Sequence, residues 1–130
     1  MDFESILGKQ DINLSDLQKF QEIYDARFVD QKFHGSDEKV RHTTLHLAKL
    51  LGKLANYSER REHGEDCSSE QIAREIVPDL LVYCLWLARE AGSDPKKAYF
   101  NRMVENIERL YKDKSSEEEI ARIRGLVERL

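Results

Sequence analysis

Apolar side chains recur every three or four positions along most of the chain, which is the spacing of one face of an α-helix. No segment alternates apolar and polar residues between turns, so we expect no β-sheet. The pattern predicts an all-α protein, a helical bundle of four main helices with an amphipathic C-terminal helix over residues 116–130. A length of 130 residues fits one hydrophobic core, so we expect one domain over residues 1–130.

The first main helix is predicted to begin at Ser15, because Ser15 and Gln18 form a capping-box pattern. Its apolar stripe, which should end near Asp30, is formed by Leu17, Phe20, Tyr24 and Phe28. We expect residues 1–14 to be loosely ordered, because they precede this start.

A long second helix should run from Ser36 to about Glu62, and its wide apolar face suggests two neighbouring elements. Gly52 interrupts it at a cost of about 1 kcal/mol relative to alanine. We therefore expect a second helix to pack closely at Gly52.

The third helix should follow the capping box of Ser68 and Gln71, with a kink at Pro78 because proline removes a helix hydrogen bond. The run from Leu80 to Ala88 is the most apolar of the chain but is far shorter than the roughly 20 residues of a membrane span. It predicts buried core, and no membrane partner.

The fourth helix should begin after Asp94, with Pro95 in its first turn, and end near Lys112. Ser116 and Glu119 then cap the C-terminal helix, whose apolar residues step by three and four.

Charge and composition narrow the class of protein. The net charge of -4 arises from both signs spread along the chain, so we expect no nucleic-acid partner. The acidic N-terminal segment does not resemble a signal peptide. Cys67 and Cys84 lie in contexts too different to suggest a disulfide or a metal site. Free thiols and a cytoplasmic location are the expectation.

Three stretches carry a resemblance to a known family. The Leu-Gly-Lys-Leu-Ala sequence of Leu51–Ala55, the run Asp79–Tyr83 and the segment Asn101–Arg109 resemble the MazG-like all-α NTP pyrophosphohydrolases over roughly residues 15–111. The pattern is most similar to short single-domain members, which include dCTP pyrophosphatases. The resemblance implies a MazG-like helical bundle, a homo-dimer or homo-tetramer, and the release of pyrophosphate from nucleoside triphosphates.

The same family binds Mg²⁺ through an E-E-x-x-E motif on the second helix and an E-x-x-D motif on the third. These motifs fall on Lys49, Leu50 and Lys53, and on Ile76 and Asp79, so only Asp79 keeps a carboxylate. The local charge thereby changes sign, which removes the main attraction for a divalent cation.

Glu75 lies one turn before Asp79 and compensates in part. Asp79 and Glu75 are therefore the candidate catalytic and metal-binding residues, with Mg²⁺ as the doubtful cofactor. Lys49 and Lys53 have two interpretations. They bind phosphate oxygens directly, or they form structural ion pairs with Glu75 and Asp79. We favour the ion pairs, because two acids and two bases balance.

His42 and His46 share a helix face at a spacing that can hold zinc, with His63, Glu59 or Asp79 as a third ligand. The sequence lacks the adjacent glutamate of the metalloprotease helix, so ordinary packing is the favoured interpretation.

The resemblance also assigns phosphate contacts to Arg102, Asn106 and Arg109, which match a K-x-x-x-N-x-x-R pattern with arginine in place of lysine. A solvated basic helix face has the same spacing and is the alternative. Tyr83 and Trp86 are candidates for stacking on a base, although their apolar surroundings favour a core position.

These observations support three functions. The first is a divergent MazG-like protein that binds a nucleotide or another phosphate ligand with weak or no hydrolysis. The second is an active, house-cleaning NTP or dNTP pyrophosphohydrolase that uses Glu75, Asp79 and a divalent metal. The third is a non-catalytic, oligomeric protein-interaction module.

Overall fold

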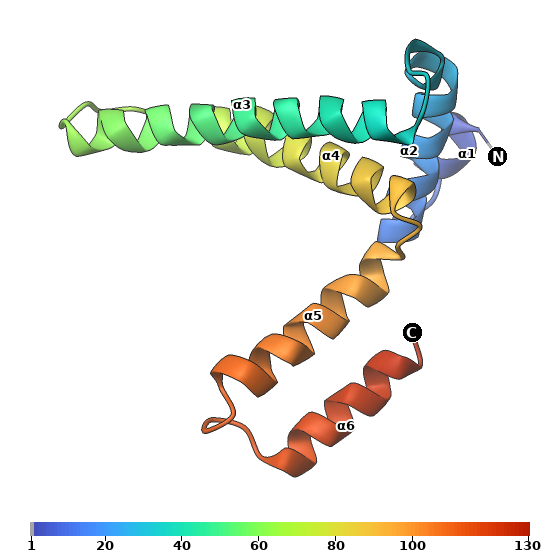
Figure 1. The fold of residues 1–130 in the computed structure, drawn as a ribbon, viewed down its shortest axis with the longest axis vertical. Helices are drawn as coiled ribbons and strands as arrows, with labels where there is room; N and C mark the ends of the chain where they lie inside the picture. Colours follow the sequence, from blue (N-terminus) through green and yellow to red (C-terminus); the bar gives the residue numbers. More distant parts are fainter. Residues whose placement is uncertain (1) are drawn as a thin grey trace. The chain divides into compact units, whose positions relative to one another are not determined.

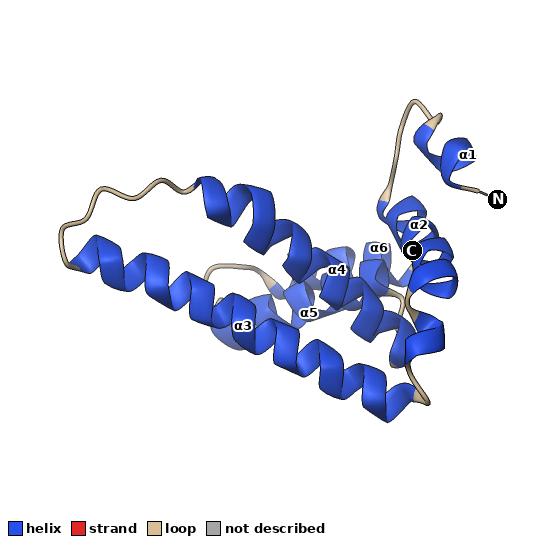
Figure 2. Cartoon of the chain, turned by 90° about the horizontal axis from the view of Figure 1, so that it is seen from above, coloured by secondary structure: helices blue, strands red, loops and turns tan. Residues whose placement is uncertain are grey.

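Helices and their connections make up the computed structural model, which describes residues 2–130 (Figure 1, Figure 2). The elements in chain order are α1 (Phe3–Leu7), α2 (Leu14–Phe28), the 3₁₀ turn η1 (Asp30–Lys32), α3 (Ser36–Glu62), the π-helical segment η2 (Ile72–Ile76), α4 (Val77–Glu90), α5 (Pro95–Leu110) and α6 (Glu117–Glu128). No strand occurs in residues 2–130, so the all-α prediction is confirmed.

The chain forms two compact units. The first, Met1–Ala91, contains α1 to α4, and the second, Gly92–Leu130, contains α5 and α6. The expectation of one domain over residues 1–130 stays a prediction. None of the helices in residues 2–130 is long and apolar enough to cross a membrane.

The N-terminal region differs from the expectation. Residues 1–14 were expected to be loosely ordered, yet Asp2 and Ser5 form a capping box at the start of α1. Asn13, rather than Ser15, caps α2 in a second capping box with Asp16. The prediction chose the wrong cap because an Asn two residues upstream satisfies the same orphan N–H groups.

The buried face of α2 is also not the predicted one. Leu17, Tyr24 and Phe28 are each at least 39% exposed, whereas Asp16 and Asp25 are buried. Each buried acid lies beside a cation, Lys9 for Asp16 and, at 3.5 Å, Arg89 for Asp25. Ion pairing therefore overrides the apolar stripe on this helix.

Helix α3 has the predicted bounds, and it runs beside α4 in opposite direction (Figure 1, Figure 2). Thr43 and Leu50 are its buried residues. The close approach expected at Gly52 is absent, because a Cβ built there meets no atom within 4 Å.

The kink predicted at Pro78 takes a different form. The chain widens into the π-helical segment η2 just before the proline, and the Val77 N–H donates to the Ile72 carbonyl. Pro78 then lies in the first turn of α4, where its missing N–H costs little. The π turn accommodates the proline by shifting the hydrogen-bond register upstream.

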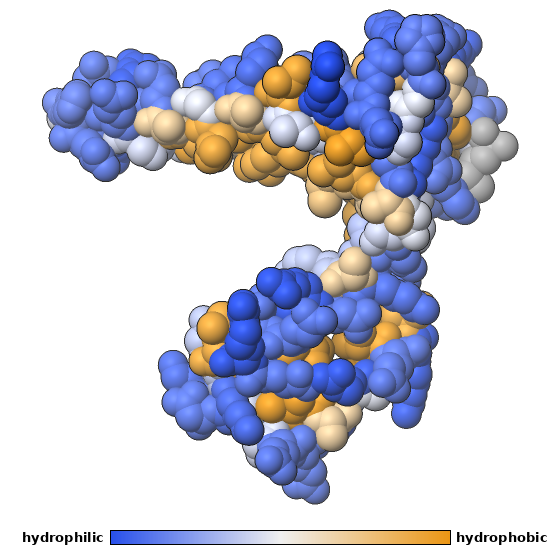
Figure 3. Space-filling model, in the orientation of Figure 1, coloured by the Kyte–Doolittle hydropathy of each residue, from blue (hydrophilic) through white to orange (hydrophobic). Residues whose placement is uncertain are grey.

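Helix α4 is less buried than its sequence suggests. Leu85 and Trp86 are buried, but Leu80, Leu81 and Val82 are 37–42% exposed. Cys84 is also exposed, and both Cys84 and Cys67 are free, as expected. The prediction of buried core from Leu80 to Ala88 is therefore wrong for most of the run. Apolar residues lie along the surface of α3 and α4 (Figure 3).

The second unit is a pair of helices whose start signals were predicted correctly. The Asp94 carboxylate accepts from the Lys96 and Lys97 N–H groups at the start of α5. The Ser116 hydroxyl accepts from the Glu119 N–H at the start of α6. Val104 of α5 and Ile120 and Val127 of α6 are buried.

Candidate functional site

The antiparallel pairing of α3 with η2 and α4 brings most of the predicted site residues together. The His46 ring stacks on the Tyr83 ring with centroids 4.9 Å apart, and Lys53 forms an ion pair with Glu75. The charges of Lys49 and Asp79 both act on His46. The residues singled out on the second and third predicted helices therefore share one face of the helix pair.

Lys53 and Glu75 form one of the two ion pairs that were predicted. Their side chains are 35% and 42% exposed, and the Gln71 amide also donates to Glu75, at 3.3 Å. The hydrogen bond from Lys53, followed by that from Gln71, holds the pKa of the Glu75 carboxyl below its ordinary value. Within residues 2–130, Lys49 and Asp79 form no ion pair, so the balanced set of two acids and two bases is not formed.

The environment of His46 and Tyr83 is partly apolar. Burial, and then the neighbouring His42 and Lys49, lower the pKa of His46. Burial, and then the charge of Asp79, raise the pKa of Tyr83. Both rings are therefore held in their neutral forms near pH 7, which suits packing against another flat ring.

The acids and histidines do not form a metal site in the described part of the chain. Among residues 2–130, no group of three or more His, Cys, Asp or Glu side chains is placed to hold an ion. Glu75 is occupied by Lys53, and the His42 and His46 rings pack edge-on at 4.3 Å. This donor set does not fit Mg²⁺, which requires several hard oxygen ligands. It also lacks the third protein ligand that a zinc site requires.

Beside this polar face lies a pocket of about 720 Å³. Helix α2, the segment around Phe33 and helix α4 form its walls. Its aromatic lining residues are Phe20, Tyr24, Phe33, Tyr83 and Trp86. Asp25, His42 and Asp79 also line it. The pocket was not predicted, because its walls come from segments far apart in the sequence.

The rings form a connected cluster rather than isolated contacts. Trp86 packs edge-on against Phe33 at 5.5 Å and against His42 at 5.8 Å. Trp86 is 4% exposed, so the expectation of a core position is confirmed for this residue. Tyr83 is only half-buried and lies between the pocket and His46.

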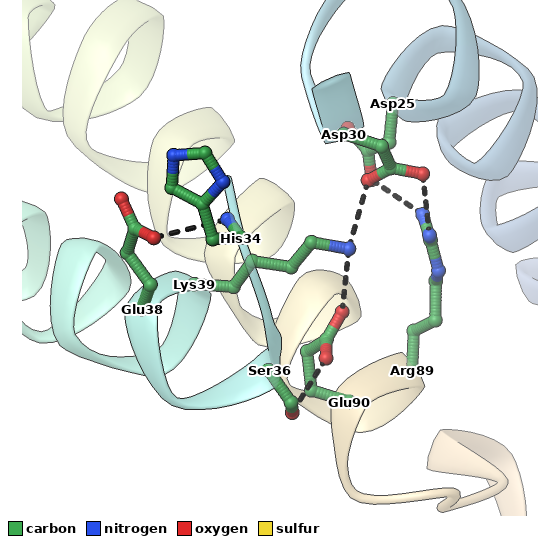
Figure 4. Close-up of polar contacts among 8 residues, drawn as sticks. All are labelled: Asp25, Asp30, His34, Ser36, Glu38, Lys39, Arg89 and Glu90. Atoms are coloured by element: carbon green, nitrogen blue, oxygen red, sulfur yellow. Dashed lines mark hydrogen bonds and ion pairs between the residues drawn. The ribbon is translucent and has the colours of Figure 1, made fainter. Parts of the chain in front are cut away.

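A second charged cluster lies where α2, η1, the start of α3 and the end of α4 meet (Figure 4). Arg89 donates to Asp30 at 2.7 Å and to Asp25 at 3.5 Å. Lys39 lies 3.2 Å from Asp30 and 3.4 Å from Glu90. This partly buried charge network joins three helices of the first unit.

Two hydrogen bonds at the edge of the network hold the start of α3 in place. The Ser36 hydroxyl donates to Glu90 at 2.7 Å, and the His34 N–H donates to Glu38 at 3.0 Å. The second contact closes the turn that leads into α3, and the first ties the start of α3 to the end of α4 (Figure 4). None of these residues was a predicted site residue, and the only available signal was an acid, Asp25, within the first predicted helix.

The residues predicted on the fourth helix lie on α5, within the second unit. Arg109 donates to the Asn106 side chain at 3.4 Å, so these two share a face. Arg102 forms an exposed ion pair with Glu105 at 3.1 Å. The phosphate contacts of Arg102, Asn106 and Arg109 stay a prediction.

Comparisons with known proteins add no family to this description. No model of a protein family matches the chain, and comparisons with curated proteins and with solved structures give no match.

Proposed function

We propose that the chain binds a nucleotide or a closely related phosphate ligand and does not hydrolyse it by a metal-dependent route. The observation that carries this proposal is the aromatic pocket, which adjoins a helix face bearing Lys49, a lysine that forms no ion pair within residues 2–130. A flat, largely apolar ring fits between aromatic walls, and an ammonium group attracts phosphate oxygens.

The two parts of the proposed site are linked by direct contacts. Tyr83 lines the pocket and stacks on His46, and the charge of Lys49 is felt at His46. A base in the pocket therefore leaves the phosphates to extend past Tyr83 and His46 toward Lys49. Lys53 is engaged by Glu75, so Lys49 is the better phosphate ligand of the two.

The state of the carboxylates supports binding without a metal-dependent reaction. The Lys53 ammonium occupies Glu75, and Asp79 has no acidic partner within the described chain that completes a metal site. A divalent cation bound by Asp79 alone would lack the ligands that position it on a triphosphate. This supports a divergent MazG-like protein in which an ion pair stands where the family would hold a metal.

Isothermal titration with ATP, CTP, GTP and UTP in buffer containing EDTA tests the binding. We expect binding without added metal, and about tenfold weaker binding for Lys49→Ala, because a charge-assisted hydrogen bond to phosphate is lost. Lys97→Ala, an exposed lysine on α5, is the matched control and should bind as the unmodified protein does. An absence of binding to all four nucleotides would contradict the proposal.

The enzyme alternative is separated by a second measurement. Release of pyrophosphate from an NTP and dNTP panel with Mg²⁺ or Mn²⁺, abolished in both Asp79→Ala and Glu75→Ala, would establish the pyrophosphohydrolase in place of the binding protein. We expect no pyrophosphate above the level given by a heat-denatured sample.

A homo-oligomer is a second proposal, supported by the exposed apolar side chains of α3 and α4. Leu45 and Leu51 of α3 are 57% and 67% exposed, and Val77 of α4 is 54% exposed. Single exposed residues are common, but apolar residues spread along a helix pair favour a partner (Figure 3). Sedimentation equilibrium should give a dimer or tetramer that dissociates in Leu51→Glu, whereas a monomeric unmodified protein would contradict it.

A further inference from the structure

Helix α3 has two sides of different character. Its buried residues, Thr43 and Leu50, lie on one side, and α3 packs against η2 and α4. The opposite side carries exposed residues that follow one another at spacings of four and three, namely Arg41, Leu45, Ala48, Gly52, Ala55 and Glu59. This spacing is typical of the seam along which two helices pair lengthwise. We call these six residues the α3 seam.

The middle of the α3 seam is uncharged and open. Leu45 is 57% exposed, and a Cβ built at Gly52 meets no atom within 4 Å. Leu51, which borders the seam, is 67% exposed. The small residues Ala48, Gly52 and Ala55 leave room for a second helix at the short end of the usual interaxial range, about 8–10 Å. An apolar face of this kind favours a helical partner over water.

The two ends of the α3 seam carry opposite charges. Arg41 lies toward the start of α3, and Glu59 lies toward its end. Both side chains are exposed, and neither takes part in an ion pair within residues 2–130. A helix that carries the same two charges in the reverse direction therefore complements both ends at once.

The partner that fits this pattern is the α3 seam itself, turned end for end. A two-fold axis at the level of residue 50 places a cation against an acid, a large side chain against a small one, and two small residues together. The facing pairs are Arg41 with Glu59, Leu45 with Ala55, and Ala48 with Gly52. A parallel pair would set Arg41 against Arg41 and Glu59 against Glu59, and like charges repel.

We infer that α3 pairs antiparallel with α3 of a second copy of this chain, with Arg41 of each copy against Glu59 of the other. The inference rests on the homo-oligomer proposed above and specifies its surface and direction. A contact made by one helix pair is smaller than the roughly 1,600 Å² of a standard interface, so the association is in the weak class. Sedimentation equilibrium over a series of protein concentrations is therefore the measurement.

A charge exchange tests the direction of pairing. Arg41→Glu and Glu59→Arg each replace two attractive pairs of the dimer by two repulsive ones, so each should weaken association on the order of tenfold. The double variant Arg41→Glu/Glu59→Arg restores both pairs and should associate as the unmodified protein does. Arg122→Glu on α6 is the matched control, because it makes the same change in net charge at an exposed position, and it should leave association unchanged.

A cysteine cross-link tests the register. In a background of Cys67→Ser and Cys84→Ser, an oxidised mixture of Ala48→Cys and Gly52→Cys proteins should form the mixed disulfide, which its mass distinguishes from the two homodimers. The residues at position 48 of the two copies are four positions apart along the axis, about 6 Å, in addition to the separation of the helices. That exceeds the reach of a disulfide, so each variant oxidised alone should cross-link far less.

The outcomes separate the antiparallel pairing from the homo-oligomer. An oligomer whose association is unchanged in Arg41→Glu and in Glu59→Arg, or is not restored in the double variant, overturns the antiparallel pairing and leaves the homo-oligomer standing. A mixed disulfide no more abundant than the two homodimers also overturns it. A protein that is monomeric at every concentration contradicts both proposals. If a charge variant fails to fold by circular dichroism, the cysteine mixture still decides.

Discussion

Two charged clusters join α3 to the continuous segment of η2 and α4 in the first unit, and they differ in burial. Lys53 and Glu75 pair where both side chains are more than a third exposed. The partly buried charge network lies at the other end of the helix pair, and its Asp25 side chain is 3% exposed (Figure 4). Its other members are Asp30, Arg89, Lys39 and Glu90. The same chemistry of carboxylates and cations therefore occurs in two different dielectric environments.

The acids respond in opposite directions. Lys53 lowers the pKa of the exposed Glu75, whereas burial raises the pKa of Asp25 even beside Arg89. Burial also acts on Asp30, but hydrogen bonds from Arg89 and Lys39 outweigh it and its pKa is lowered. The comparison shows that Arg89 donates a shorter hydrogen bond to Asp30 than to Asp25. Asp25 is therefore the acid whose negative charge is less well compensated.

Removing Arg89 should change the free energy of unfolding more than any change to the Lys53–Glu75 pair. Arg89→Ala leaves two acids without their cation, and we expect a loss of about 2–3 kcal/mol in the free energy of unfolding, below the full range for a buried pair because the side chain is 29% exposed. Urea denaturation measures this loss. Arg102→Ala, which removes an exposed pair on α5, should change the unfolding free energy by far less. Equal effects of the two variants would refute the distinction between buried and exposed pairs.

Asp25 should make the protein less stable as pH rises, which is the opposite of the usual effect of a carboxylate. Its folded pKa is raised above the ordinary 3.8, so the unfolded chain ionises first as pH rises. The unmodified protein should therefore lose stability relative to Asp25→Asn as pH increases through the interval above 3.8. Urea midpoints of the two proteins at several pH values measure the difference. A gain for the unmodified protein over that interval would show that Arg89 compensates Asp25 fully.

The ionisation of Glu75 should have the smallest effect on stability, and that effect should be opposite in sign to the effect of Asp25. Its folded pKa lies below the ordinary 4.5, so its contribution is present above pH 4.5 and is lost as pH falls through the lowered value. NMR titration of the side-chain carboxyl carbon should give a midpoint below 4.5 in the unmodified protein and a higher midpoint in Lys53→Met, because the largest cause of the lowered pKa is removed. Because the pair is exposed, added salt should shrink this difference. Identical midpoints in the two proteins would mean that the ion pair does not persist in solution.

The parts of the fold that follow from local sequence were predicted well. Helix α3 has the predicted bounds, and Asp94 and Ser116 cap the helices expected of them. These features depend on residues within one helical turn, which a single sequence displays. The caps of the first two helices, Asp2 and Asn13, follow the same rule but were missed in favour of Ser15.

The site was predicted only where it lies on two neighbouring helices. The pairing of Lys53 with Glu75 follows from the register of α3 against η2, and one of the two expected ion pairs formed. The pocket and the partly buried charge network were not predicted, since Asp25 and Arg89 are 64 residues apart. No local pattern indicates that an acid in a helix will turn inward.

The sequence by itself determined that this chain is helical and where most of its helices begin and end. Only the tertiary structure decided which side chains are buried. Packing turned Asp25 inward and left Leu81 at the surface, because a helix face is chosen by its neighbours and by available counter-charges as well as by its own apolar stripe. Asp25 of α2 and Trp86 of α4 line one pocket only because α2 and α4 meet.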